Sequence, residues 1–138
     1  MISEPHSIML DAHALSCLAT RTPAMLAWGA AARRTGSEMY VSTATLAETT
    51  DGSTRDAAVR RIVNGINREN VTESLGYTAG RLRAKAASIR RKPRDLTVDA
   101  IVAATAMSLR PPVVVITSDS GDLELLLDGT GIRVYQID

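Results

Sequence analysis

The chain of 138 residues has little of what defines several protein classes. Its one cysteine, Cys17, excludes an internal disulfide and fits a reducing cytoplasm. Aromatic residues make up 3% and phenylalanine is absent, so base stacking on an aromatic platform is not a plausible binding mode. No apolar run approaches the roughly 20 residues of a membrane span, and the N-terminus does not resemble a signal peptide. No Cys/His cluster suits zinc. We therefore expect one soluble globular domain over residues 1–138.

Charge is distributed unevenly behind the net value of +1. Residues 55–94 hold eleven basic and three acidic side chains, whereas residues 95–138 hold two and seven. Fourteen of the sixteen cations are arginine, whose planar fork suits phosphate. For any single arginine a solvated helix face is the simpler interpretation, but the basic middle as a whole is a candidate for contact with an RNA backbone. The candidates are Arg81, Arg83, Lys85, Arg90, Arg91, Lys92 and Arg94.

Short apolar runs alternate with helical patterns along the chain. Strands are predicted at residues 7–10, 38–42, 113–116 and 132–137. Residues 113–116 are all β-branched, which is typical of a strand buried on both faces of a parallel sheet. Helices are predicted in two pieces from about residue 11 to 34, broken near Pro23, and over residues 43–49, 55–66 with Ser53 or Thr54 as N-cap, 73–91, 96–110 with Thr97 as N-cap, and 122–129. This alternation predicts an α/β sandwich with a parallel or mostly parallel sheet.

Acidic residues stand at the strand ends and helix starts of this pattern. Asp11 ends the first strand, Glu48 lies about one helical turn past the second, and Asp99 opens a helix. Asp119 and Asp122 follow the buried strand. If the sheet is parallel, these positions share one edge, and uncompensated carboxylates there would repel one another. Mg²⁺ or Mn²⁺, which prefers oxygen ligands, would relieve that repulsion.

Most of these acids also have a structural explanation when each is considered alone. Asp99 would stabilise a helix through its dipole, and Glu48 completes a capping box with Thr45. Either acid of the last pair could cap the helix that follows. Asp11 is harder to explain, because a carboxylate at the end of an inner strand is costly unless it is paired or bound to a cation.

Five segments of the chain form an ordered set of motifs: IMLDAHAL at 8–15, VSTATLAET at 41–49, AGRLRAKA at 79–86, LTVDAIVAATAM at 96–107 and VVVITSDSGDLELL at 113–126. This set resembles the PIN-domain ribonucleases, in particular VapC-type toxins of toxin–antitoxin pairs. Each motif is loose by itself, but together they occur in the order of the family and span nearly the whole chain. One departure is TTDG at 49–52, which lacks the large or basic side chains common in relatives.

The resemblance implies a three-layer α/β/α sandwich with a central, mostly parallel sheet and a metal-dependent endoribonuclease activity with Mg²⁺ or Mn²⁺. It also implies an RNA substrate, a small antitoxin as partner, and a homodimer. The implied site comprises Asp11, Glu48, Asp99 and Asp119 as catalytic and metal-binding acids, Asp122 as a further metal ligand, and the hydroxyls of Thr117 and Ser118 near the metal.

The expected reaction is in-line attack of a metal-activated water on an RNA phosphodiester. One ion would be held by Asp11, Asp99 and Asp119, and the sequence leaves open whether a second acts near Glu48. A phosphate-accepting signalling domain is one rival, but it needs a lysine late in the chain, and none follows Lys92. The other is a catalytically silent PIN fold that binds only RNA or protein; such a protein is expected to have lost at least one metal acid, and here all are present.

Overall fold

A five-stranded parallel sheet forms the centre of the protein. The structure is a computed structural model that describes residues 4–89 and 95–137. The strands occur in the order β3-β2-β1-β4-β5, and all four neighbouring pairs are parallel, as predicted. Their bounds are β1 Ser7–Leu10, β2 Glu38–Ser42, β3 Asn67–Glu69, β4 Val113–Thr117 and β5 Arg133–Gln136.

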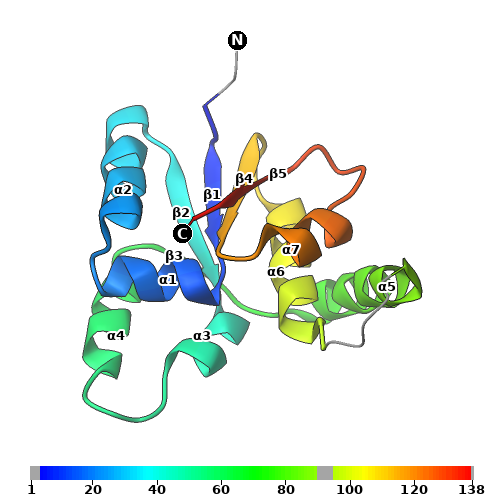
Figure 1. Ribbon diagram of the computed structural model, residues 1–138, viewed down its shortest axis with the longest axis horizontal. Helices are drawn as coiled ribbons and strands as arrows, with labels where there is room; N and C mark the ends of the chain where they lie inside the picture. Colours follow the sequence, from blue (N-terminus) through cyan, green and yellow to red (C-terminus); the bar gives the residue numbers. More distant parts are fainter. Residues whose placement is uncertain (1–3, 90–94, 138) are drawn as a thin grey trace.

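Helices cover both faces of the sheet, which confirms the predicted three-layer sandwich. Figure 1 shows α1, α2 and α4 on one side of the sheet and α5, α6 and α7 on the other, with α3 at one end. In the described part of the chain, no helix is both long and apolar enough to cross a membrane. The helices are α1 Ala12–Ala19, α2 Pro23–Thr35, α3 Thr43–Thr49, α4 Asp56–Asn64, α5 Glu73–Ile89, α6 Thr97–Ser108 and α7 Ser120–Leu126.

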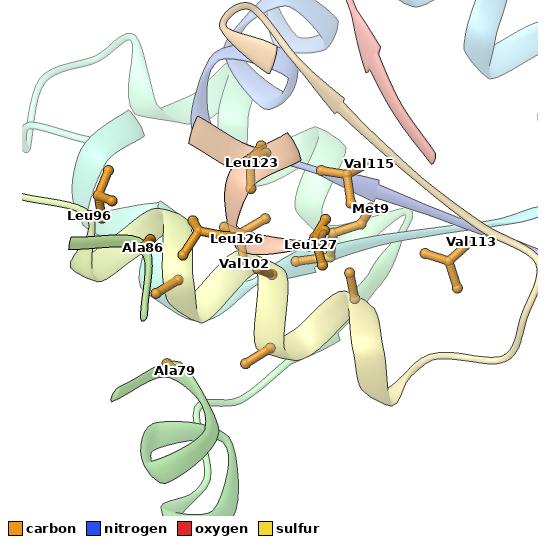
Figure 2. Close-up of a cluster of buried hydrophobic side chains, with 14 residues drawn as sticks. Met9, Ala79, Ala86, Leu96, Val102, Val113, Val115, Leu123, Leu126 and Leu127 are labelled. Carbon is orange, nitrogen blue, oxygen red and sulfur yellow. The ribbon is translucent and has the colours of Figure 1, made fainter. Parts of the chain in front are cut away.

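Strands β1 and β4 supply side chains to a core on each face of the sheet, because successive side chains of a strand point in opposite directions. Ile8 and Leu10 of β1 pack on the side of α1 and α2, whereas Met9 packs on the side of α6 and α7. Figure 2 shows this second core, in which Met9 lies close to Leu127 and to Val102 of α6. Burial on both faces explains why β1 and β4 read as continuous apolar runs.

The break between the first two helices lies where the sequence predicts it. Pro23 is the first residue of α2, a position where its missing N–H costs nothing. The helix ends at Gly36, which adopts a left-handed conformation with φ of 76° that glycine tolerates best. The chain then turns directly into β2.

Strand β3 was not predicted, because its residues Asn67 to Glu69 are all polar and at least partly exposed. It is an edge strand that pairs with β2 through the backbone. The Asn67 side chain strengthens this pairing, since its amide donates to the carbonyl of Met39 at 3.0 Å. A polar edge strand carries no apolar pattern from which it could be recognised.

The predicted N-cap Thr97 is wrong by one residue. Thr97 is already the first residue of α6, and the N-cap position is held by Leu96. The carboxylate of Asp95 accepts hydrogen bonds from the Thr97 amide at 3.0 Å and the Thr97 hydroxyl at 2.6 Å. These bonds hold the pKa of Asp95 below its usual value. The carboxylate that caps the start of α6 thus belongs to Asp95, two residues before the predicted N-cap Thr97.

The predicted N-caps Ser53 and Thr54 of the fourth helix are also wrong, because Arg55 holds that position without a side-chain cap. The carboxylate of Asp56, buried in the first turn of α4, instead accepts hydrogen bonds from the amides of Asp51 at 3.1 Å and Gly52 at 2.8 Å. Asp56 therefore ties the loop before α4 to the helix.

Replacing Asp56 with alanine should destabilise the fold. The change leaves two loop amides without their acceptor, which we expect to lower the free energy of unfolding by about 1–3 kcal/mol in urea denaturation. The control is Arg55→Ala, which removes an exposed ion pair with Asp51 and should cost less than about 0.5 kcal/mol. Equal effects of the two changes would show that Asp56 does not hold the loop.

Candidate active site

The order of the strands creates a crevice at the carboxyl ends of β1 and β4. These strands are neighbours, with Leu10 paired to Ile116, but the helices that follow them cover opposite faces of the sheet. The chain passes from β1 into α1 and from β4 into α7, so the two connections diverge. Such a point in an open parallel sheet is where ligands bind.

A small cavity of about 160 Å³ lies at this position. Four carboxylates line it, from the end of β1, from α3, from the first turn of α6 and from the loop after β4: Asp11, Glu48, Asp99 and Asp119. The hydroxyl residues Thr117 and Ser118 line it too. The structure thus brings together six side chains that the sequence singled out from distant segments.

Four lining residues were not predicted as part of the site, and one of them is Ala12, the first residue of α1. Val98 and Val102, from the first turns of α6, supply an aliphatic wall. His13 is exposed in the first turn of α1, where the sequence indicated only the start of a helix. In the sequence, Val98 and Val102 could have been found only from their positions on the same helix as Asp99. His13 could have been found only from its closeness to Asp11 in the chain.

Asp11 is the most buried of the four carboxylates, with 8% of its surface exposed. It is the N-cap of α1 and accepts a hydrogen bond from the Ala14 amide at 2.8 Å. Burial raises its pKa above the ordinary value of 3.8. Hydrogen bonds from Ala14 and from the Thr117 hydroxyl, together with the charge of His13, oppose this rise without cancelling it. A cation beside Asp11 would favour its charged form.

The loop after β4 presents Asp119 to the cavity through a short network. The Asp119 amide donates to the Thr117 hydroxyl at 3.1 Å, and the Asp119 carboxylate accepts from the Gly121 amide at 3.2 Å. Asp119 is therefore the N-cap of α7, one of the two capping residues that the sequence offered for this helix. Capping uses one carboxylate oxygen, Oδ1, and is compatible with a second role for this exposed side chain.

The capping-box interpretation of Glu48 is wrong. Ser42, not Thr45, is the N-cap of α3, and its hydroxyl accepts from the Ala44 amide at 3.2 Å. Thr45 lies inside the helix, and its hydroxyl donates to the Ser42 carbonyl at 2.8 Å. Glu48 stands in the last turn of α3, where an acid does not benefit from the helix dipole. Its place at the cavity therefore has no local structural explanation.

Those of the remaining predicted residues that the structure describes do not line this cavity. Asp122 is buried in the first turn of α7, with 6% of its surface exposed. Arg81, Arg83 and Lys85 are exposed on α5. Arg90, Arg91, Lys92 and Arg94 lie outside the described residues.

The donor set fits a hard divalent cation, because carboxylate and hydroxyl oxygens are the ligands that Mg²⁺ and Mn²⁺ prefer. Within residues 4–89 and 95–137, no three His, Cys, Asp or Glu side chains are already arranged to hold a metal ion. Glu48 and Asp119 are exposed and can turn about their side-chain bonds. Binding would thus require the carboxylates to close on the ion from these rotatable positions.

Comparisons with known proteins agree with this parallel α/β architecture. The family model of the PIN domain matches residues 8–124. The chain belongs to the PIN domain family, which confirms the resemblance seen in the sequence. A search of curated proteins gives no match.

Several solved structures share the fold at low sequence identity. A chain of VapBC2 from Rickettsia felis, bound to a promoter DNA fragment, aligns with a TM-score of 0.74 and 10% identity, covering 96% of this chain and 99% of that one. DNA-bound VapBC from Salmonella typhimurium gives 0.66 and 20%, with 94% and 97% covered. VapBC-5 from Mycobacterium tuberculosis, a member of a toxin–antitoxin family, gives 0.60 and 22%, with 96% and 100% covered.

Proposed function

We propose that the protein is a metal-dependent endoribonuclease that hydrolyses RNA phosphodiester bonds and acts as the toxin of a toxin–antitoxin pair. The observation that carries the proposal is the convergence of Asp11, Glu48, Asp99 and Asp119 on one small cavity at the divergence of β1 and β4. Membership of the PIN domain family supports the same assignment. The single chain would act as one catalytic domain.

In this proposal Asp11, Asp99 and Asp119 would hold a Mg²⁺ or Mn²⁺ ion, and Glu48 lines the same cavity from α3. When bound, the ion supplies a lowered pKa for a water nucleophile and neutralises charge on the phosphate. Asp119 is positioned for this role by the Thr117 hydroxyl.

Three further groups have supporting roles. Ser118 adds a second hydroxyl to the cavity wall. Asp122 stands outside that wall and adds negative charge at the start of α7. The aliphatic side chains of Val98 and Val102 keep part of the cavity surface dry, which strengthens electrostatic interactions inside it.

RNA is guided to the cavity, in this proposal, by the basic stretch of the chain. Arg81, Arg83 and Lys85 are exposed on α5, which packs along α6, the helix that carries Asp99. Backbone phosphates would bind these cations without regard to base sequence, so the affinity for RNA should fall as salt rises. The sequence adds Arg90, Arg91, Lys92 and Arg94 to the same basic stretch.

The proposed protein partners are a small antitoxin and a second copy of the chain. The solved structures with the same fold include toxin–antitoxin complexes, among them one from Klebsiella pneumoniae with a TM-score of 0.65. An antitoxin that covers the acidic cavity would block the substrate. A short reading frame directly upstream in the genome is the expected source of that partner.

A cleavage assay on structured and unstructured RNA tests the proposal. We expect cleavage with Mg²⁺ or Mn²⁺, none with EDTA, and a loss of about 100-fold in rate for Asp99→Asn, equivalent to about 2.7 kcal/mol of transition-state stabilisation. Asp128→Asn, which removes the same charge from an exposed turn, should leave the rate unchanged. A wild-type protein that binds RNA but never cuts it would instead show a catalytically silent PIN fold.

A further inference from the structure

A second cavity of about 400 Å³ adjoins the candidate active site. It lies between α1, α4 and the end of α3, and Glu48 lines both cavities. We infer that this second cavity holds the nucleobase next to the cleaved phosphodiester and favours bases that carry an exocyclic amino group. The inference rests on the proposed ribonuclease function, because that function brings an RNA strand past Glu48.

The volume and the apolar wall of the second cavity suit a nucleobase. Its volume falls within the range of about 300–1,000 Å³ that is usual for small-molecule sites. Ala19, Ala58 and Val59 supply an apolar wall from α1 and α4. Small side chains there leave room that a larger residue would fill.

Hydrogen-bond acceptors dominate the polar lining of the second cavity. The hydroxyls of Thr20, Thr49 and Thr50 each donate their one hydrogen to a backbone carbonyl one helical turn earlier, at 3.0, 3.1 and 2.6 Å. Toward any other partner these oxygens can therefore only accept. The carboxylates of Glu48 and Asp51, when ionised, are also acceptors only.

This polarity discriminates between bases. Cytosine, adenine and guanine each carry an amino group that can donate to such oxygens. Uracil has a carbonyl oxygen where cytosine has its amino group, and its one donor on that edge is the ring N3–H. A carbonyl that faces another acceptor loses the hydrogen bond it made with water. A polar mismatch of this kind separates ligands by more than the loss of a methyl group does. The cavity should therefore disfavour uracil.

Arg55 supplies a contact for the phosphate of a nucleotide, although three carboxylates, those of Glu48, Asp51 and Asp56, line the same cavity. The Arg55 guanidinium lines this cavity and donates to the Asp51 carboxylate at 3.2 Å. That pair is exposed, so exchanging it for a phosphate contact costs little. The planar guanidinium suits a phosphate oxygen pair.

The direct test is an NMR titration of the full chain with CMP and UMP, which differ at C4 by an amino or a carbonyl group and at N3 by the absence or presence of a hydrogen. We expect CMP to shift the amides of Thr50, Asp51 and Ala58 and to bind at least about tenfold more tightly than UMP. Ala58→Leu fills the cavity and should abolish the shifts, while Ala57→Leu, exposed on the same helix, should retain them. If Ala58→Leu does not fold, Thr50→Val replaces it.

Three results would overturn the inference: equal binding of CMP and UMP, CMP shifts confined to other residues, or binding of arginine amide at this cavity without binding of CMP. RNA cleavage provides a separate readout. On substrates that vary only the base beside the cut, Ala58→Leu should lower kcat/KM about tenfold for cytosine and leave uracil unchanged. Cleavage without CMP binding would contradict this inference alone, whereas CMP binding without cleavage would contradict the ribonuclease function alone.

Discussion

Asp11→Asn is expected to lower the rate of RNA cleavage by about 100- to 1,000-fold without unfolding the protein. Removing one preorganised group that acts on transition-state charge commonly has an effect of about this size. Asparagine keeps the shape of the side chain and is as good an N-cap as aspartate, so the hydrogen bond from the Ala14 amide is retained. What is lost is the negative charge in the most buried part of the acidic cavity.

The same substitution should stabilise the protein at neutral pH when no divalent ion is present. Burial raises the pKa of Asp11 above 3.8, so the folded state takes up this proton more readily than the unfolded state does. The stability that Asp11 contributes is therefore fully present below 3.8 and is lost as pH rises through the raised folded value. Asp11→Asn removes this loss, so its advantage in Tm should appear at pH 7 and vanish below pH 3.8.

Thermal unfolding in EDTA at several pH values measures this advantage. Asp128→Asn is the matched control, because it removes one acid from an exposed turn and should leave the pH profile of Tm unchanged. A variant at Asp11 that cleaves RNA at the wild-type rate would refute its catalytic role. A lower Tm than wild type at pH 7 would show that its buried charge is compensated inside the protein.

Leu123→Ala is expected to reduce the free energy of unfolding by about 2–5 kcal/mol, the usual range for a large core side chain. Leu123 is 1% exposed and packs in the core formed by α6, α7 and one face of the sheet (Figure 2). It follows directly after Asp122, in the helix that Asp119 caps. The cavity left by this substitution should loosen the packing of α7, and α7 holds the loop that carries Asp119.

Urea denaturation gives the size of this effect, and Glu124→Ala is the control. Glu124 is the next residue of α7 and is exposed, so its removal should change the free energy of unfolding by less than about 0.5 kcal/mol. A loss below about 1 kcal/mol for Leu123→Ala would mean that the α7 core repacks. RNA cleavage by the folded fraction should be less affected than in Asp11→Asn, because no cavity carboxylate is removed.

The sequence predicted the inner part of the fold because that part depends on buried apolar side chains. Ile8 to Leu10 and Val113 to Ile116 are apolar on both faces, and only a covered parallel strand needs that pattern. The positions of Asp11 and Asp119 directly after these strands then follow from the parallel order. Their convergence on one cavity could thus be anticipated.

Features set by local hydrogen bonds could not be predicted. Strand β3 pairs through its backbone and shows no apolar pattern. The start of α6 depends on Asp95, and the loop before α4 depends on Asp56, although in each case a nearby serine or threonine also matched the N-cap preference. Helix register likewise decides that Asp122 is buried while Asp119 is exposed at the cavity.

We propose that Asp11, Asp99 and Asp119 together bind a divalent ion, with Glu48 lining the same cavity. A titration with Mn²⁺ followed by electron paramagnetic resonance tests it most directly, because free and bound Mn²⁺ give different signals. We predict saturable binding by the wild-type protein, at least about tenfold weaker binding by Asp99→Asn, and unchanged binding by Asp128→Asn. Equal Mn²⁺ affinity in the wild type and Asp99→Asn would contradict the account.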